Sequence, residues 1–526
     1  MDIQLYDTTL RDGTQGKGMQ LSLEDKLQIA KRLDAFGMAY IEGGWPGSNP
    51  KDGAFFEQAA KLSWEKARLV AFGATRRAGI QVEEDANLQA LLDAKTPVVA
   101  LVGKAWDLHV DKVLGISNAE NLQMIRDSIR YMKAHGKEVV FDAEHFFDGF
   151  RHNPAYALAV ARVAEEAGAD WLVLCDTNGG SLPDAISHVT WQVAGIAQIP
   201  LGIHAHNDAE LAAANSLAAV GAGATMVQGT VNGFGERCGN ANLVSLIPTL
   251  QLKLAKSCIP HDHLSQLTSL AHYVAEVANV APNPHAAYVG NAAFAHKGGI
   301  HVAAVAKLAQ SYEHIDPSLV GNQRQIVISE LSGRRNIRLG SEGLGMDVAG
   351  QEAELLQRIK DLEFAGYQFE NAEASFALLA LRNREENTQP PFEMLEVRTL
   401  AEKRGHKLSS EAVIKVKVNQ HTLHVAAVGN GPVHALDQAL RKALLPDFPH
   451  IGKVRLTDYK VRILNAEAAT GAGVRVLVEA ATDEATWRTV GVSTNIIAAS
   501  CEALCDSFEW YLRQNTPEPA LCASPP

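Results

Sequence analysis

Two histidines separated by a single residue are the first feature of this sequence that could do chemistry. They stand in LGIHAHND (201–208), where an apolar run leads into His204 and His206. Side chains two positions apart lie on the same face of a β-strand, so both imidazoles could reach one metal ion. The pattern is equally compatible with two ordinary polar residues at a strand end. A third ligand from elsewhere in the chain is needed before the pair predicts a metal site.

The best source of that ligand is YDTTLRDGTQ (6–15), which contains Arg11 and Asp12. An adjacent arginine and aspartate often form only a weak surface ion pair. Two histidines and one carboxylate, with positions left open, suit a divalent ion that acts as a Lewis acid. Because water and substrate oxygens would complete such a site, Mg²⁺ or Mn²⁺ is favoured over structural zinc.

A glycine-rich segment, NGFGERCGNANL (232–243), offers a fourth polar group. Glycines often serve only tight turns, so this segment alone is weak evidence for a site. The amide oxygen of Asn240 could nevertheless bind the same ion. Glu236 and Arg237 could form a local ion pair, which is the more ordinary role for Arg237.

These groups need a scaffold, and the chain supplies a repeating one. A short apolar run followed by an Ala/Leu/Glu-rich stretch with helical spacing recurs eight times. Parallel strands that are apolar on both faces and alternate with helices predict a (β/α)₈ TIM barrel, with an open doubly wound sheet as the alternative. The predicted strands are 3–7, 39–44, 68–73, 97–103, 138–145, 171–176, 201–206 and 226–233.

Polar side chains gather at the carboxyl ends of these predicted strands, which favours the barrel. In a TIM barrel that face carries the chemistry and the opposite face carries stability. The His204–His206 pair and Asp12 would then point into the same barrel mouth. The strand-end residues are Asp7, Glu42, Glu144, Asp176, His204, His206 and Asn232.

The chain has 526 residues, which is enough for more than one domain. We expect the barrel in 1–265 and helical linker subdomains in 266–390, with NTQPPFEML (387–395) as a linker. Residues 391–513 should form an α+β regulatory domain, and 514–526 a disordered tail.

The predicted C-terminal domain contains a weak internal repeat. Residues 426–440 and 488–504 each combine a strand, a Val-Gly pair and an amphipathic helix. Alternating runs precede both copies, at 413–418 and 423–428 and at 461–466 and 474–480. We therefore expect a duplicated α+β unit.

Composition excludes several classes of protein. The chain has 48 lysines and arginines and 60 acidic residues, which gives a net charge of −12. It contains no cluster of basic residues that could bind the phosphate backbone of a nucleic acid. The six cysteines are scattered, with no Cys-x-x-Cys pair and no secretory signal. No apolar run approaches the roughly 20 residues of a membrane helix. We expect a reduced, soluble, cytoplasmic protein.

Four motifs in this order resemble the acetyl-CoA-dependent aldol synthases of the DRE-TIM metallolyase superfamily, the family of α-isopropylmalate and homocitrate synthases. They are DTTLRDGTQ (7–15), GIHAHND (202–208), GFGERCGNANL (233–243) and HKGGIH (296–301). The C-terminal repeat looks like the regulatory domain of the same family, so the resemblance covers nearly the whole chain.

Within the family, three segments resemble the citramalate synthase branch: EGGWPGSNPKDGAFF (42–56), DYKVRILN (458–465) and TWRTVGVSTNIIAAS (486–500). Thr14 departs from the family pattern, because many relatives have glutamate there. The departure puts any role for position 14 in doubt. Arg11, Asp12 and Gln15 still match the family's first motif.

The resemblance implies a set of roles. Asp12, His204 and His206 would be metal ligands, and Asn240 would complete the protein's share. Arg11 would face the ketone oxygen of a 2-oxo acid and stabilise the alkoxide as it forms. The residues implied to bind substrate are Arg11, Gln15, Glu144 and Thr177, the last through the oxo-acid carboxylate.

A base must remove a proton from the acetyl-CoA methyl group. The resemblance implies Glu144 or His296, with Tyr312 beside them. The ordinary alternative for Glu144 is a helix cap or an ion pair with Arg11, and the sequence around His296 by itself predicts a solvent-exposed residue. In relatives this region reaches the neighbouring subunit's barrel, so a homodimer is implied.

The resemblance further implies the condensation of acetyl-CoA with pyruvate to citramalate, with isoleucine as the effector of the C-terminal domain. We expect Trp45 to favour pyruvate over larger oxo acids, because small changes in a pocket wall can switch substrate. The alternatives are an isopropylmalate or homocitrate synthase, a lyase that runs the aldol reaction in reverse, and an inactive barrel that serves as an amino-acid sensor.

Overall fold

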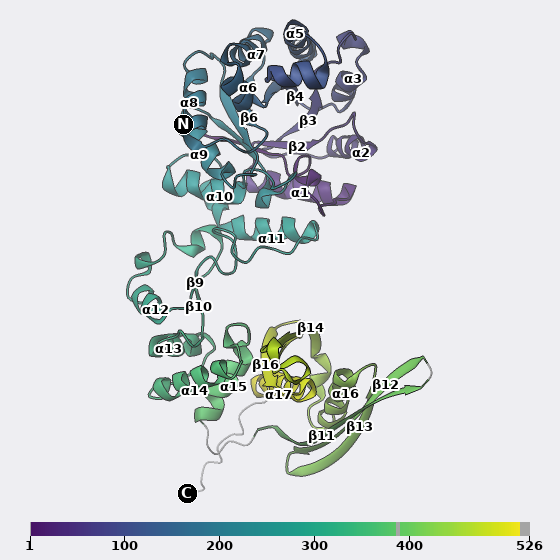
Figure 1. Ribbon diagram of the computed structural model, residues 1–526, viewed down its shortest axis with the longest axis vertical. Coiled ribbons are helices and arrows are strands. Elements are labelled where there is room, and N and C mark those ends of the chain that lie inside the picture. Colours follow the sequence, from purple (N-terminus) through teal and green to yellow (C-terminus); the bar gives the residue numbers. More distant parts are fainter. Residues whose placement is uncertain (1, 385–389, 405, 516–526) are drawn as a thin grey trace. The chain divides into compact units, whose positions relative to one another are not determined.

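The computed structural model describes residues 2–384, 390–404 and 406–515, and they divide into two compact units. The first unit contains the residues up to 294 together with 315–323. The second contains 295–314 and the residues from 324 onward. Figure 1 labels most of the helices and strands of both units.

The first unit is a closed barrel of eight parallel strands in sequence order. Because β1 pairs with both β2 and β8, the sheet has no free edge, which confirms the predicted TIM barrel and excludes the doubly wound sheet. The strands are β1 (Gln4–Asp7), β2 (Tyr40–Gly44), β3 (Arg68–Ala74), β4 (Val98–Lys104), β5 (Glu138–Glu144), β6 (Trp171–Asp176), β7 (Leu201–Ala205) and β8 (Met226–Gly229).

Helices cover the outside of the barrel (Figure 1). Between strands lie α1 (Leu23–Phe36), α2 (Pro50–Ala59), α3 (Ala86–Asp93), α4 (Asp107–His109), α5 (Asn118–Ala134), α6 (Phe146–His152), α7 (Pro154–Ala167), α8 (Pro183–Ala194) and α9 (Ala212–Gly221). After β8 come α10 (Leu243–Pro248) and α11 (Leu267–Val277). The start of α1 is a capping box, in which the Ser22 side chain accepts a hydrogen bond from the Asp25 N–H and the Asp25 side chain accepts one from the Ser22 N–H.

Two apolar layers hold the barrel together. The larger layer packs the helices against the outer faces of the strands, and its members include Leu33, Ile41 and Phe141. The smaller layer fills the barrel interior and includes Tyr6, Val70 and Val173. The interior is therefore a packed core, and the polar side chains buried within it include Glu42, Asp142 and Gln228.

The second unit begins with a mainly helical region. It contains the short paired strands β9 (Ala295–His296) and β10 (Gln325–Ile326), and the helices α12 (Gly299–Val305), α13 (Arg334–Gly343), α14 (Glu352–Phe364) and α15 (Glu373–Arg384).

The predicted duplication is present in the rest of this unit. Each copy is a three-stranded antiparallel sheet followed by one long helix. The first is β11 (Phe392–Arg404), β12 (Lys407–Val418), β13 (His421–Gly429) and α16 (Pro432–Leu444). The second is β14 (Arg455–Ile463), β15 (Val474–Ala481), β16 (Thr486–Ser493) and α17 (Ile496–Asn515).

Two boundary predictions need correction. The linker predicted over 387–395 is too long, because Phe392 already pairs with Val418 in the first sheet. The tail predicted from 514 also starts too early, because α17 continues to Asn515. Residues 385–389 and 516–526 lie outside the described residues. In the described part of the chain, no helix combines the length and apolar character that crossing a membrane requires.

Candidate active site

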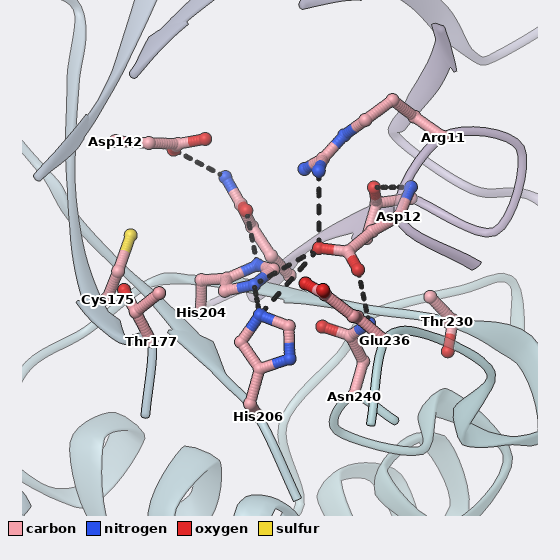
Figure 2. A network of polar contacts seen from close by, with 12 residues as sticks. Arg11, Asp12, Asp142, Cys175, Thr177, His204, His206, Thr230, Glu236 and Asn240 are labelled. Atoms are coloured by element: carbon pink, nitrogen blue, oxygen red, sulfur yellow. Dashed lines mark hydrogen bonds and ion pairs between the residues drawn. The ribbon is translucent and has the colours of Figure 1, made fainter. Parts of the chain in front are cut away.

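Three predicted ligands meet at the barrel mouth. The Nε2 atoms of His204 and His206 lie 3.3 Å apart. They are 3.6 Å and 3.9 Å, respectively, from Oδ2 of Asp12. Figure 2 shows the two rings and the carboxylate turned toward one another. Among the described residues, these three form the one cluster of histidine, cysteine or acidic side chains whose ligand atoms lie close enough together to bind a metal ion.

The electrostatics of these ligands suit a cation. Burial opposes ionisation of Asp12, but Arg11 and then His204 outweigh it and lower the pKa of Asp12 to about 2. Burial lowers the pKa of His204 as well, and burial together with His204 lowers the pKa of His206 to about 4. At neutral pH the site therefore presents one carboxylate and two uncharged imidazoles, the protonation states that metal binding requires.

Asn240 lies beside this group, as predicted. Its Nδ2 donates to Oδ1 of Asp12 at 3.0 Å and to the carbonyl oxygen of Phe234 at 3.1 Å. Its Oδ1 is buried without a hydrogen-bond partner, as is Nδ1 of His206. A buried acceptor next to two imidazoles and a carboxylate fits a divalent metal, because an orphaned polar atom is otherwise costly. Whether Asn240 binds the metal directly stays a prediction.

Arg11 is held above the same site by three contacts. Its Nε donates to Oε1 of Glu42 at 2.5 Å, and its Nη1 lies 3.3 Å from Oδ2 of Asp12. The guanidinium stands 4.0 Å from the centre of the Phe72 ring. Burial would lower the pKa of Arg11, but the Glu42 carboxylate, followed by that of Asp12, raises it above its usual value. Arg11 is thus a fixed, permanently charged donor at the metal site.

The role of Glu42 was missed in the sequence, where it was only one of several strand-end residues. It is fully buried on β2 and accepts hydrogen bonds from Tyr6 and from Oγ1 of Thr8, the latter at 2.7 Å. Together with Arg11, these donors balance its buried charge. Glu42 therefore orients Arg11.

Asp12, His204 and His206, the candidate metal group, lie in the wall of a cavity of about 550 Å³. Trp45, Phe72 and Val102 form part of its wall, and the Trp45 and Phe72 rings pack edge to face with centroids 5.4 Å apart. The structure brings most of the predicted site residues to this one space. The cavity is lined by Arg11, Asp12, Gln15, Glu144, Thr177, His204 and His206, among others.

Glu144 and Thr177 have partners that sequence did not suggest. Glu144 forms an ion pair with Lys104 of the neighbouring strand β4, rather than with Arg11. The Oγ1 atom of Thr177 accepts the backbone N–H of His145 at 2.8 Å. Because that contact uses the oxygen as an acceptor, the hydroxyl hydrogen stays free to donate into the cavity.

Arg237 forms the predicted ion pair with Glu236, and the loop after β8 is also fixed by a shorter contact that the sequence did not suggest. Arg237 binds both carboxylate oxygens of Asp208, at 2.7 and 2.8 Å, and lies farther from Glu236, at 3.7 Å. Its Nη2 also donates to the carbonyl oxygen of Thr177 at 2.7 Å. Asp208 therefore fastens this loop to the end of β7. Asn232, which was expected at the barrel mouth, instead donates to the carbonyl oxygen of Ala271.

His296 and Tyr312 belong to the second unit. The expectation that His296 is solvent-exposed is wrong, because it is 9% exposed and its Nε2 lies 3.1 Å from Oε1 of Glu313. Arg324 binds both oxygens of Glu313, at 2.5 and 2.6 Å. Tyr312 is 48% exposed, with its ring centre 4.3 Å from that of His301. Active-site roles for His296 and Tyr312 stay predictions.

Comparison with known families matches three parts of the chain. Residues 2–274 match the HMGL-like family, and residues 288–366 match the homocitrate synthase post-HMGL domain-like family. Residues 370–512 match the LeuA allosteric (dimerisation) domain. The first match covers the barrel, including Asp12, His204, His206 and Asn240.

Curated relatives match over nearly the full length of the chain. The chain is 50% identical over 518 residues to an (R)-citramalate synthase of Geobacter sulfurreducens, with 98% of each chain covered. A protein of the same name from Synechocystis is 52% identical over 526 residues, covering 97% of this chain and 96% of that protein. The one from Aquifex aeolicus is 50% identical over 525 residues, with 99% of each chain covered.

Proposed function

Because the chain belongs to the HMGL-like family, and within it to the citramalate synthases, we propose that it condenses acetyl-CoA with pyruvate to give (R)-citramalate and free CoA. This reaction opens the pyruvate route to isoleucine. The enzyme is an acyltransferase that converts the acyl group into an alkyl group on transfer. The observation that carries the proposal is the convergence of Asp12, His204 and His206 under Arg11 in one cavity.

Asp12, His204 and His206 would hold a divalent ion, Mn²⁺ or Mg²⁺, with Asn240 completing the set through its unpaired oxygen. An ion held there would supply Lewis-acid polarisation of the oxo-acid ketone. Arg11 lies beside the ligands and would donate to the ketone oxygen as it becomes an alkoxide. Its contacts with Glu42 and Phe72 fix the guanidinium before substrate arrives.

Thr177 suits recognition of the substrate carboxylate. Thr177 lines the cavity, and because its hydroxyl oxygen already accepts a backbone N–H, its hydrogen is available to donate to the substrate carboxylate. Gln15 lines the same cavity and is exposed, which suits a polar contact with substrate at the rim.

Two groups can serve as the base that removes a proton from the acetyl methyl group. Glu144 lines the cavity but already binds Lys104. The hydrogen bond from Arg324 lowers the pKa of Glu313, which keeps the Glu313 side chain ionised. This carboxylate accepts the Nε2–H of His296, and Nδ1 of His296 therefore keeps its lone pair. We propose His296 as the base, assisted by Tyr312, with Glu144 as the alternative. His296 would then act at the barrel of a second subunit in a homodimer.

We propose that residues 1–265 are catalytic, 266–390 link the parts of the chain, and 391–513 bind isoleucine as a feedback effector. The LeuA match over 370–512 supports both dimerisation and regulation. Calorimetric titration with isoleucine, with leucine as the matched comparison, tests the effector. Binding of leucine in preference to isoleucine would contradict it.

Release of free CoA from acetyl-CoA tests the reaction itself. We expect Mn²⁺-dependent release with pyruvate, and much less with 2-oxoisovalerate or 2-oxoglutarate. The Asp12→Ala variant provides the inactive control. A preference for 2-oxoisovalerate would make the protein a 2-isopropylmalate synthase, the name carried by a relative 31% identical to it. A preference for 2-oxoglutarate would indicate a homocitrate synthase, and no release with any oxo acid would favour an inactive, amino-acid-sensing barrel.

A further inference from the structure

Gln228 is a polar side chain in the packed interior of the barrel. It lies on β8, fully buried, in direct register with His204 on the neighbouring strand β7. Met226, two positions earlier on the same face of β8, is apolar and belongs to the interior layer. A buried amide in such a place is stable only if both of its ends have hydrogen-bond partners.

Both ends of this amide are satisfied. Oε1 of Gln228 lies 3.0 Å from Nδ1 of His204, and Nε2 of Gln228 donates to Oδ1 of Asp142 on β5 at 2.9 Å. The three side chains form a chain of contacts that crosses the barrel from β7 to β8 to β5. His204 and Asp142, both labelled in Figure 2, are its two ends.

The direction of these hydrogen bonds determines which nitrogen of His204 carries the proton. An amide oxygen can only accept, so Nδ1 of His204 must be protonated. The other nitrogen, Nε2, then keeps its lone pair, and it is the atom that faces Asp12 and His206. If Gln228 rotated by half a turn, its NH₂ group would face Nδ1 and favour the opposite tautomer. That rotation would also break the hydrogen bond that Nε2 of Gln228 donates to Oδ1 of Asp142.

We propose that Gln228, anchored by Asp142, is a positioning residue that holds His204 in the Nδ1-protonated tautomer and thereby aims the Nε2 lone pair at the metal. The inference rests on the proposed metal site and adds two residues to it that touch neither metal nor substrate in this role. Partners of this kind typically contribute 10- to 100-fold in metal affinity.

Titration of the metal-free protein with Mn²⁺ tests the proposal without depending on turnover. Gln228→Leu removes the acceptor, and we expect it to weaken Mn²⁺ binding by about 10- to 100-fold. Gln228→Glu keeps an acceptor opposite Nδ1, so it should bind nearly as tightly as the unsubstituted protein. Gln89→Leu, on the exposed face of α3, is the matched control and should leave binding unchanged.

A second pair of variants tests the same proposal if Gln228→Leu fails to fold. Asp142→Asn retains an oxygen that can accept from Gln228, whereas Asp142→Leu does not. We expect Asn at this position to preserve Mn²⁺ affinity and Leu to reduce it. In the weakened variants the visible spectrum of bound Co²⁺ should also change, since a misdirected imidazole alters the ligand geometry.

The outcomes separate this inference from the proposed function. If Gln228→Leu and Asp142→Leu are folded and bind Mn²⁺ as tightly as the unsubstituted protein, the positioning role is overturned and the metal site stands. If the unsubstituted protein itself binds no Mn²⁺, the metal site is overturned, and the proposed function and the positioning role fall with it.

Discussion

Oδ2 of Asp12 lies 3.6 Å from Nε2 of His204, although one residue follows the first strand of the barrel and the other lies on the seventh. The two are near one another because β8 pairs with both β1 and β7, which closes the sheet. In an open sheet these strands could lie at opposite edges. The metal group is therefore a product of barrel closure.

Replacing His204 with alanine should abolish metal-dependent CoA release and leave the barrel folded. The change removes one of three converging ligands, and the ring is at the barrel mouth rather than in the apolar layers. The thioester assay measures the loss, and circular dichroism checks the fold. His188→Ala, an exposed histidine on α8, is the control. Full activity in His204→Ala would refute the assignment of the metal site.

Arg11→Lys should lower kcat by about 10²-fold, the usual loss when a preorganised donor to a developing oxyanion is removed. Lysine keeps the charge but cannot bind Glu42 and stack on Phe72 as a planar guanidinium does. Arg32→Lys, an exposed arginine on α1, controls for the substitution itself. Unchanged steady-state kinetics in Arg11→Lys would remove Arg11 from the chemistry.

Trp45→Ala should broaden the choice of oxo acid. Trp45 lines the cavity, packs on Phe72, and donates its indole N–H to Oδ1 of Asn87 at 2.7 Å, so it forms a fixed wall. Its loss should reduce the ratio of kcat/KM for pyruvate over 2-oxoisovalerate by about tenfold or more, the scale of one methylene in a pocket.

Trp191→Ala is the control for that experiment, because Trp191 is 68% exposed. The ratio should be the same in this variant as in the unsubstituted protein. If Trp45→Ala also leaves it unchanged, discrimination between oxo acids lies in other walls of the cavity.

Asp142 should make stability depend on pH. Burial, and then the charge of Glu42, raises the pKa of Asp142 to about 8, whereas an unfolded aspartate titrates near 4. Between these values the folded state keeps a proton that the unfolded state has lost. The stability from this group is thus complete below about pH 4 and is lost as the pH rises toward 8.

Asp142→Asn removes this dependence. In the presence of a chelator, the thermal midpoint of Asp142→Asn should rise relative to that of the unsubstituted protein as the pH increases from 5 to 8. Asp93→Asn, a substitution of an exposed residue on α3, should show no such trend. A difference in midpoint between Asp142→Asn and the unsubstituted protein that stays constant with pH would contradict the raised pKa.

Mixed dimers should reveal whether His296 acts on the partner's barrel. We expect His296→Ala and Asp12→Ala to be inactive alone. After subunit exchange, a mixed dimer would pair an intact barrel with an intact His296, which restores about a quarter of the sites on statistical mixing. Mixing Asp12→Ala with His204→Ala should restore nothing, because every barrel is then defective. If the mixture of His296→Ala and Asp12→Ala recovers no CoA release, His296 does not act at the active site of the partner subunit.

Much of the scaffold followed from local patterns. All eight barrel strands were placed within a few residues, because buried parallel strands form continuous apolar runs between helices with amphipathic spacing. The largest error was the end of the last strand, expected at 233 and found at Gly229. There Asn232 adopts a positive φ of 61° and the chain turns away. The first strand of the C-terminal repeat, β11, was missed because a proline pair in front of it suggested a linker.

The sequence alone predicted which residues would be the metal ligands. Asp12, His204, His206 and Asn240 stand in local motifs, and the resemblance of those motifs to a known family implies their roles. Only the tertiary structure decided which partners hold the predicted site residues in place: Glu42 for Arg11, Lys104 for Glu144, Glu313 for His296, and Gln228 for His204. The type of a site residue is a property of one local segment, whereas its partner depends on how strands and loops distant in the sequence come together, which local sequence does not encode.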